Sequence, residues 1–355
     1  MLAQILAVLL IGLLAWALNK SLRAPPPMIC GTPGGPPVTA TRMKLRDGRH
    51  LAYQENGVPK EEAKHKIVFV HGFTSNRLDP MIVTNLSPEA VRELGVYVVT
   101  FDRPGYGESD PDPNRTPKSL ALDIEELADY LGLGSKFYVV GKSMGGQVVW
   151  GCLKYIPHRS QIVGLFRLAG AALVAPVINY WWPSFPAKLA NEAYKLQLPQ
   201  DQWALRIAHY APWLTYWWNT QKLFPSSAVI ARRPETLSRQ DLELVSRYGE
   251  GRYLKEVATQ QGAYESLHRD MKIGFGKWEF DPMAMENPLP NDEGKVHLWQ
   301  GDEDKKVPVD LQRFIAKKLP WIQYHELPGA GHALHYVPGM IEGVLRALLV
   351  GEEGK

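Results

Sequence analysis

One pentapeptide, Gly141-Lys142-Ser143-Met144-Gly145, constrains the fold of this 355-residue chain more than any other feature. It follows an apolar run, residues 137–140, that is typical of a buried strand, and Met144, Val148 and Cys152 recur behind it at helical spacing. A sharp turn from a strand into a helix crowds the backbone, and glycines two residues before and after the serine relieve that crowding. The pattern therefore predicts a nucleophile elbow that holds the hydroxyl of Ser143 above the edge of a sheet.

A serine nucleophile needs a base and a group that orients the base, and the chain supplies candidates for both further on. An acidic loop, residues 301–308, follows a predicted strand at 296–299, and one of its acids can orient a histidine. His332 follows the predicted strand 322–327 in a glycine-rich turn and is the candidate base. His335 is its nearest rival, but it lacks flanking glycines and we interpret it as a surface residue at the start of a helix.

The oxyanion of such a reaction needs two N–H donors. The predicted strand 67–70 ends in His71-Gly72-Phe73, where the glycine lets the N–H of Phe73 face the reacting carbonyl. With the N–H of Met144, this gives the two predicted donors. We expect His71 to shape this loop, and Asp102, in a glycine- and proline-rich turn, to cap that turn and to pair with Arg103.

These segments occur in a familiar order: strand-His-Gly-Phe, Asp102-Arg103-Pro104-Gly105-Tyr106-Gly107, the serine pentapeptide, Gly-x-x-Asp-x-x-Val-Pro and Gly-x-Gly-His. From Met43 to the C terminus the chain resembles the α/β-hydrolase superfamily, and it is most similar to plant membrane-associated members with a helical cap. The resemblance implies that the acid is Asp304, the fourth residue of Gly301-x-x-Asp, and that Asp302 is a solvated loop carboxylate. It also disfavours epoxide and haloalkane hydrolysis, because those relatives carry aspartate at the elbow.

The fold expected from the strand and helix pattern, and from this resemblance, is an α/β-hydrolase fold with a mostly parallel central sheet flanked by helices and an inserted helical cap. The cap is expected because more than a hundred residues after Pro176 lack strand character. Its tryptophans suit an apolar substrate group, or simply fix the cap helices to the core. The predicted units are residues 1–24 (membrane anchor or signal), 25–41 (Pro/Gly-rich hinge), 42–176 (hydrolase core, first part), 177–292 (cap) and 293–355 (core, second part).

Net charge, cysteine count and the absence of known binding motifs limit the classes of partner and cofactor that we expect. Forty basic and 37 acidic residues leave a formal charge of +3, which argues against nucleic acid as a partner. Two cysteines cannot form a disulfide framework. The sequence contains no zinc, Walker or dinucleotide motif, so we expect neither a metal nor another cofactor. The expected partners are a small apolar ester or lipid-like substrate and, through the N-terminal segment, a membrane.

The N-terminal segment has an uncharged apolar run, residues 2–18, followed by Lys20 and Arg23. An uncleaved anchor and a cleavable signal compete as explanations, and we favour the anchor because no basic residue precedes the run. The positive flank then predicts a single-pass anchor in the endoplasmic reticulum with the catalytic domain in the cytosol. The alternative is secretion after cleavage at residues 15–17.

The predicted function is that of a serine hydrolase that cleaves a carboxylic ester or related acyl substrate through an acyl-enzyme. Ser143 attacks, His332 moves the proton, Asp304 orients His332, and Phe73 and Met144 hold the oxyanion. Thioester, amide or carbon–carbon bond cleavage can use the same triad. The alternatives are a ligand receptor with slow or no turnover on the same fold, and an acyltransferase in which an alcohol replaces water.

Two departures from the superfamily pattern add further expectations. Lys142, next to the nucleophile, either favours an anionic substrate or points to solvent, and we favour the second. The segment 160–167 is longer and more apolar than the connection expected between the elbow helix and the next strand, which is typical of a splice or gene-model variant.

Overall fold

The computed structural model describes residues 2–79, 85–134, 136–163, 167–248, 252–290 and 294–351. Within these ranges eight strands form one sheet in the order β1-β2-β4-β3-β5-β6-β7-β8. The first two pairs, β1 with β2 and β2 with β4, are antiparallel, and every later pair is parallel. The strands are β1 (Thr41–Lys44), β2 (His50–Gly57), β3 (His65–Val70), β4 (Val96–Phe101), β5 (Lys136–Lys142), β6 (Arg167–Val174), β7 (Lys295–Gly301) and β8 (Ile322–Leu327).

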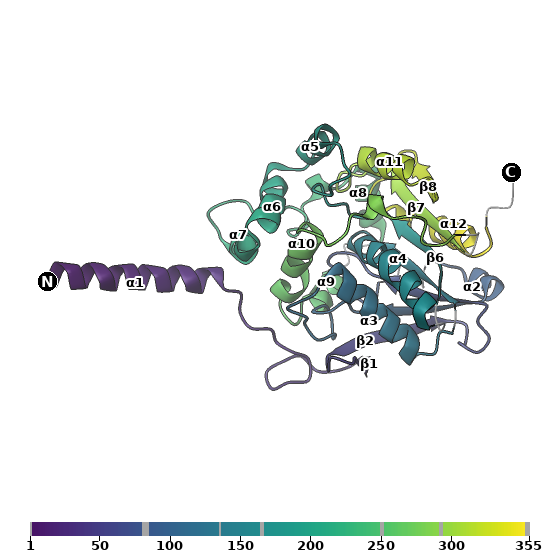
Figure 1. The fold of residues 1–355 in the computed structure, drawn as a ribbon, viewed down its shortest axis with the longest axis horizontal. Coiled ribbons are helices and arrows are strands. Elements are labelled where there is room, and N and C mark those ends of the chain that lie inside the picture. Colours follow the sequence, from purple (N-terminus) through teal and green to yellow (C-terminus); the bar gives the residue numbers. More distant parts are fainter. Residues whose placement is uncertain are drawn as a thin grey trace.

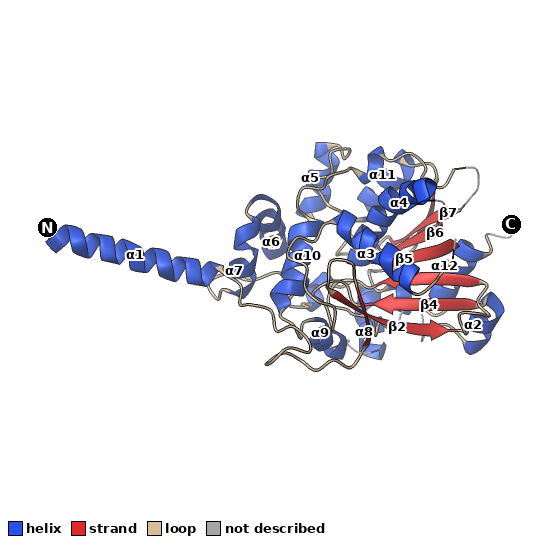
Figure 2. Ribbon diagram, turned by 60° about the horizontal axis from the view of Figure 1, so that its bottom comes forward, coloured by secondary structure: helices blue, strands red, loops and turns tan. Residues whose placement is uncertain are grey.

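Helices cover both faces of this sheet (Figure 2). In β3, Val68 and Val70 belong to the apolar core that includes α3 and α4, whereas Ile67 and Phe69 belong to the core that includes α2 and α12. Because successive side chains of a strand point to opposite faces, an unbroken apolar run serves both cores. The helices are α1 (Leu2–Leu22), α2 (Pro88–Leu94), α3 (Pro117–Tyr130), α4 (Met144–Val163), α5 (Ala187–Lys195), α6 (Pro199–Tyr210), α7 (Thr215–Thr220), α8 (Arg239–Tyr248), α9 (Arg252–Ala258), α10 (Arg269–Gly274), α11 (Val309–Lys318) and α12 (Met340–Leu349).

The helices α5 to α10 all lie in the chain between β6 and β7, and Figure 1 shows α5, α6, α7 and α10 gathered beyond one end of the sheet. The predicted α/β-hydrolase fold with a helical insertion is therefore confirmed. The boundaries of the five predicted units stay a prediction.

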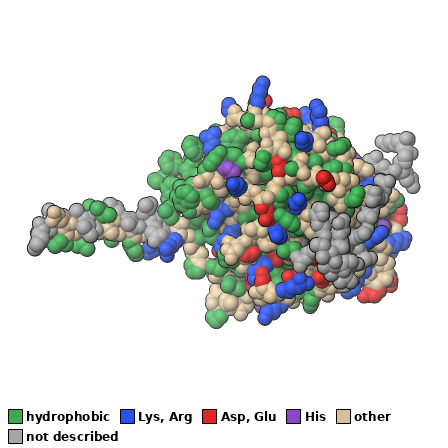
Figure 3. All heavy atoms as spheres, in the orientation of Figure 1, with side chains coloured by type: hydrophobic (Ala, Val, Ile, Leu, Met, Phe, Trp, Pro, Cys, Tyr) green, Lys and Arg blue, Asp and Glu red, His purple; other side chains and the backbone are tan. Residues whose placement is uncertain are grey.

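The tryptophans of the insertion divide between core and surface. Trp182 is buried and lies edge-on to Trp150 and Trp278, which fixes the insertion to the core. Trp203 and Trp213 are instead exposed, and Figure 3 shows hydrophobic side chains gathered over α6 and α7. Apolar packing against the core thus explains part of the tryptophan content, as the alternative interpretation expects.

The N-terminal helix α1 projects away from the sheet and its flanking helices (Figure 1). Among the described residues, the structure contains no helix whose length and apolar character suffice to traverse a bilayer. The apolar stretch between the polar residues Gln4 and Asn19, residues 5–18, is shorter than the about 20 consecutive apolar residues that a hydrocarbon core requires. The predicted single-pass anchor in the endoplasmic reticulum is therefore wrong, and this finding gives no support to the predicted membrane partner.

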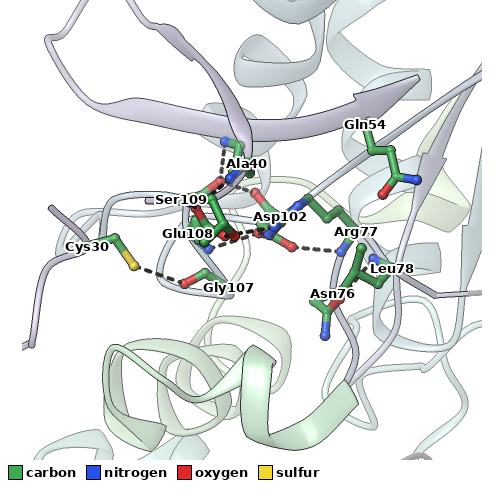
Figure 4. A network of polar contacts seen from close by, with 12 residues as sticks. Cys30, Ala40, Gln54, Asn76, Arg77, Leu78, Asp102, Gly107, Glu108 and Ser109 are labelled. Atoms are coloured by element: carbon green, nitrogen blue, oxygen red, sulfur yellow. Dashed lines mark hydrogen bonds and ion pairs between the residues drawn. The ribbon is translucent and has the colours of Figure 1, made fainter. Parts of the chain in front are cut away.

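The predicted hinge is docked on the core rather than detached from it (Figure 4). The carboxylate of Glu108 accepts hydrogen bonds from the N–H groups of Thr39, at 2.7 Å, and Ala40, at 2.9 Å, and from the Thr39 hydroxyl, at 2.6 Å. Cys30 is buried, and its thiol lies 3.6 Å from the carbonyl oxygen of Gly107. These contacts fix the path of the chain into β1.

Helix α4 continues to Val163 and β6 begins at Arg167. Residues 164–166 and the side chains of residues 157–167 lie outside the described part of the chain. The interpretation of segment 160–167 as a splice or gene-model variant therefore falls largely outside the described residues.

Candidate active site

Ser143 lies at the turn between β5 and α4, in the left-handed backbone region with φ of 53°. Steric crowding explains why glycine occurs two residues before and two residues after Ser143. A Cβ on Gly145 would lie 2.1 Å from the carbonyl oxygen of Val70, and one on Gly141 would lie 2.5 Å from the carbonyl oxygen of Gly145. No side chain fits at such distances. The pentapeptide thus forms the sharp strand-to-helix turn that its sequence predicts.

Three predicted residues are joined by hydrogen bonds. His332 Nε2 lies 2.9 Å from Ser143 Oγ, and His332 Nδ1 lies 2.7 Å from Asp304 Oδ2. Because a carboxylate only accepts, Nδ1–H donates to Asp304 and leaves Nε2 to accept from the serine hydroxyl. All three residues are buried, and they follow β5, β7 and β8, whose carboxyl ends meet at one edge of the parallel sheet.

Asp304 is held by its own loop as well as by His332. Its Oδ1 accepts from the N–H groups of Lys306, at 2.8 Å, and Val307, at 3.0 Å, and its Oδ2 accepts from Gln300 Nε2, at 3.0 Å. Burial by itself raises the pKa of Asp304, but the charge and hydrogen bond of His332 and the two N–H donors outweigh burial, so the pKa is lowered overall. The carboxylate therefore remains ionised beside the imidazole.

The structure brings Asp304, and not Asp302, to His332. Asp302 Oδ1 accepts from the N–H of Gly329 at 2.7 Å, so this carboxylate fastens the turn that follows β8. It is only partly buried. The choice of Asp304 that the resemblance implies thus agrees with the geometry.

His335 and Lys142 differ from expectation, because neither faces solvent. His335 is buried in the short helical turn Leu334–Tyr336, and its Nε2 lies 2.6 Å from Lys142 Nζ. Lys142 Nζ also lies 3.6 Å from Asp79 Oδ2. Burial, followed by the positive charge of Lys142, lowers the pKa of His335 well below its ordinary value, so the neutral ring accepts from the ammonium. The predicted surface roles of His335 and Lys142 are therefore wrong.

Phe73 and Met144, the predicted oxyanion donors, flank the serine. Met144 is the first residue of α4, and Phe73 follows Gly72, where a Cβ would lie 3.2 Å from the Ser143 Cβ. In the described part of the chain, no carbonyl or side chain outside α4 accepts from either N–H. Both N–H groups are therefore available to a bound oxygen atom.

The loop that carries Phe73 is fixed by His71, as expected. His71 Nδ1–H donates to the carbonyl of Gly72 at 2.8 Å, and Nε2 accepts from the N–H of Arg103 at 3.1 Å. Burial lowers the pKa of His71 well below its ordinary value, and the nearby Arg103 guanidinium lowers it further. A neutral histidine is what this pair of hydrogen bonds requires.

Asp102 caps its turn as predicted but does not pair with Arg103. Its carboxylate accepts from the N–H of Glu108, at 2.9 Å, and from the backbone and guanidinium of Arg77, at 2.7 and 2.6 Å (Figure 4). Arg103 instead pairs with Asp270 of α10, 2.7 Å away. The predicted pairing of Asp102 with Arg103 is therefore wrong.

Sequence reasoning missed Asp241, which supports the histidine from the insertion. Its carboxylate accepts from the N–H groups of His332, at 3.1 Å, and Ala333, at 2.7 Å. These partners are 91 and 92 residues away in the chain, so no local pattern marks the contact. A weak signal exists only in the spacing from Ser238 to Asp241, whose side chains bond each other's backbone N–H groups.

Two cavities meet at Ser143, and they differ in character. The first, here called the apolar cavity, has a volume of about 80 Å³ and is lined mainly by apolar side chains, such as Met144, Ile178 and Phe275. The second, here called the cationic cavity, measures about 270 Å³. Its basic lining residues are Lys142, Arg232, Arg233 and Lys306. The residues that line both cavities are Phe73, Ser143, Val229, Lys306 and His332.

No cluster of three or more His, Cys, Asp or Glu side chains in the described ranges is arranged to hold a metal ion. The thiols of Cys30 and Cys152 are free and buried, and burial raises the pKa of both. Neither lies among the residues that line the two cavities.

Comparison with known proteins agrees with the fold described above. The sequence profile described as "Alpha/beta hydrolase family" matches residues 67–341. A curated relative, the 2-hydroxy-6-oxononadienedioate/2-hydroxy-6-oxononatrienedioate hydrolase of Comamonas testosteroni, is 22% identical over 242 residues, which cover 68% of this chain and 72% of that protein. None of these matches supports the predicted similarity to plant membrane-associated proteins.

Among solved structures, an alpha/beta hydrolase enzyme, MGS-M2, from a Medee basin deep-sea metagenome library superposes with a TM-score of 0.59 at 16% identity, covering 89% of this chain and 98% of its own. A thermophilic esterase from Thermogutta terrifontis superposes with a TM-score of 0.52 at 20% identity, covering 87% and 96%. At these identities the likeness establishes a shared fold.

Proposed function

We propose, from the premise that this chain belongs to the alpha/beta hydrolase family, that it is a serine hydrolase which cleaves a carboxylic ester or related acyl compound through an acyl-enzyme. The observation that carries the proposal is the unbroken hydrogen-bonded series from Asp304 through His332 to Ser143. This series ends at a hydroxyl that opens into two cavities. A nucleophile, a base and a group that orients the base are what acyl transfer requires.

Each residue has a role in the proposed reaction. Ser143 Oγ attacks the scissile carbonyl carbon while His332 Nε2 takes its proton, and the N–H groups of Phe73 and Met144 stabilise the oxygen that becomes negative. His332 then returns the proton to the leaving group, and an acyl-serine forms. A water molecule, activated in turn by His332, releases the acid. Asp304 keeps the imidazole in the tautomer that both steps need.

Two features support an acyl compound with an apolar group as the substrate. The elbow carries serine, and the resemblance to the superfamily implies that epoxide and haloalkane hydrolysis would need aspartate there. The apolar cavity beside Ser143 suits an alkyl or aryl group. The names of two relatives, the Thermogutta esterase and the Comamonas hydrolase, support hydrolysis as the general reaction.

The test compares the full-length protein with Ser143→Ala and, as a matched control, Ser246→Ala, which removes the hydroxyl of an exposed serine on α8. We expect the wild type and the control to bind a fluorophosphonate probe covalently and to hydrolyse 4-nitrophenyl esters of graded chain length. Ser143→Ala should lose labelling, and its kcat should fall by a factor on the order of 10⁶. A folded wild type that neither labels nor turns over any ester would refute the proposal.

A further inference from the structure

Lys306 lies two residues after Asp304, at the junction of the two cavities. Its backbone N–H donates to Asp304, and the residue lines the apolar cavity, the cationic cavity and a third, neighbouring cavity. Across the described ranges of the chain, its Nζ makes no hydrogen bond and no ion pair. A partly buried ammonium without a counter-ion is energetically costly, so a fold that keeps one beside a nucleophile leaves a site for an anion.

The lining of the cationic cavity has an excess of positive charge. Its basic residues are Lys142, Arg232, Arg233 and Lys306, and its acidic lining residue is Asp79. Lys142 lies 3.6 Å from Asp79, so these two charges largely compensate each other. Positive charge on low-dielectric walls raises the local concentration of anions and directs them to the site.

A third cavity next to the site has the opposite charge. It measures about 480 Å³. Its charged lining residues are the acids Asp201, Glu235, Asp302, Glu303 and Asp304 and the bases Lys305 and Lys306, so negative charge is in excess. An anionic group would be repelled there and attracted to the cationic cavity, which gives a charged substrate one orientation relative to Ser143.

The charges around Lys306 determine how its ammonium would respond to a bound anion. Burial lowers the pKa of Lys306, and the charges of Lys142 and Arg232 lower it further, although Asp304 and Asp241 oppose this effect. An anion within hydrogen-bond distance of Nζ would favour the charged ammonium again. Binding of the substrate and protonation of Lys306 would thus support each other.

We propose that Lys306 is a specificity-determining residue that binds an anionic group of the substrate, such as a carboxylate, in the cationic cavity while an apolar part of the same molecule occupies the apolar cavity. This inference rests on the proposed serine hydrolase function and names its substrate class. The substrate is an ester that is apolar on one side of the scissile bond and negatively charged on the other.

The test uses two matched pairs of esters with the full-length protein. In the first pair, 4-nitrophenyl pentanoate is compared with mono-4-nitrophenyl glutarate, which places a carboxylate on the acyl side. In the second pair, phenyl butanoate is compared with 4-carboxyphenyl butanoate, which places the carboxylate on the leaving-group side. We expect the wild type to favour the charged member of at least one pair, and this preference to weaken as salt is raised.

Lys306→Gln should lower kcat/KM for the favoured charged ester about ten- to hundredfold more than for its neutral partner, mainly through KM, because one charge-assisted hydrogen bond is lost. Lys306→Arg should restore part of the preference. Lys318→Gln is the matched control, since it removes the same charge from an exposed residue of α11 that lines none of these three cavities, and it should leave both members of each pair unchanged.

The results separate this inference from the function on which it rests. If the wild type prefers neither charged ester, or if Lys306→Gln slows both members of a pair equally, the inference is wrong, while turnover that Ser143→Ala abolishes still supports a serine hydrolase. If the wild type hydrolyses no ester and does not label, both the function and the inference fail.

Discussion

At the scale of single residues, non-glycine residues with a strained, left-handed backbone conformation lie close to the nucleophile. Thr74, Ser143 and Arg232 all have positive φ without being glycine, with values of 57°, 53° and 55°, and all three line the cationic cavity. Each such residue costs on the order of 1–3 kcal/mol, and it persists where surrounding contacts determine the conformation. At Ser143 the strained turn orients the hydroxyl toward His332.

Replacement of Asp304 tests the triad at this scale. Asp304→Asn should lower kcat by about 10⁴-fold, the order found when the orienting aspartate of a serine protease is replaced, because an amide can donate to Nδ1 and stabilise the wrong tautomer. Asp302→Asn is the matched control: its oxygen only accepts from Gly329, and an amide oxygen can do the same. Steady-state hydrolysis of a 4-nitrophenyl ester measures both. Equal losses in the two variants would contradict the assignment of Asp304.

At the scale of elements, one carboxylate connects the helical insertion to the sheet. Asp270 of α10 is buried and bonds Arg103 Nη1 at 2.7 Å, Arg115 Nη2 at 2.8 Å and the Tyr106 hydroxyl at 2.6 Å. Both arginines are buried as well, so their charge depends on this one partner. Since Met271 follows directly and lines the apolar cavity, the same contact positions a wall of the site.

Loss of this carboxylate should therefore affect the fold strongly. Asp270→Asn leaves two buried guanidinium groups without a counter-charge, and we expect the free energy of unfolding to fall by about 3–5 kcal/mol. Denaturant titration followed by circular dichroism measures the loss. Asp310→Asn is the control, because it breaks an exposed pair with Arg313 that contributes at most about 1 kcal/mol. A loss for Asp270→Asn no larger than that of the control would show that the arginines find other partners.

Whether a feature depends on residues that are near or distant in the chain explains how much of the fold and the site the sequence could predict. The elbow, the strands and the loop of Asp304 are local patterns, and each is recognisable within about ten residues. Asp270 with Arg103 and Lys142 with His335 join positions 167 and 193 residues apart, and neither has a local signature. The surface roles expected for Lys142 and His335 failed for this reason, since burial of a polar residue depends on what the rest of the chain brings to it.

At the scale of the whole molecule, buried histidines link folding to pH. His71 and His335 have pKa values lowered well below 6.5, and burial lowers those of His268 and His297 to about 4. In the unfolded chain these groups bind protons near pH 6.5, whereas the folded state excludes them. Their contribution to stability is therefore complete above pH 6.5 and is lost as the pH falls toward 4. Asp123, whose pKa burial raises to about 6 against the opposing effect of Arg49, counteracts the trend, because its folded form binds a proton at a higher pH than the unfolded chain does.

His268 allows this linkage to be measured at one site. It is buried, its Nδ1 has no hydrogen-bond partner within the described residues, and burial is the cause of its lowered pKa. The wild type should lose about 2 kcal/mol between pH 7 and pH 5 through this group alone, and His268→Gln should not. The destabilisation caused by His268→Gln, measured by urea unfolding, should thus be smaller at pH 5 than at pH 7 by about that amount.

Leu267→Ala is the control for this measurement, because it removes a buried neighbour that does not titrate, and its cost should be the same at both pH values. If the two variants respond to pH alike, His268 takes up its proton without unfolding the chain. The acid sensitivity of the molecule would then have to arise from carboxylates whose pKa values the fold lowers, such as Asp304 and Glu108. The raised pKa values of Asp102, Asp123 and Asp201 act in the opposite direction. A pH-independent cost for His268→Gln would therefore contradict the linkage of buried histidines to stability.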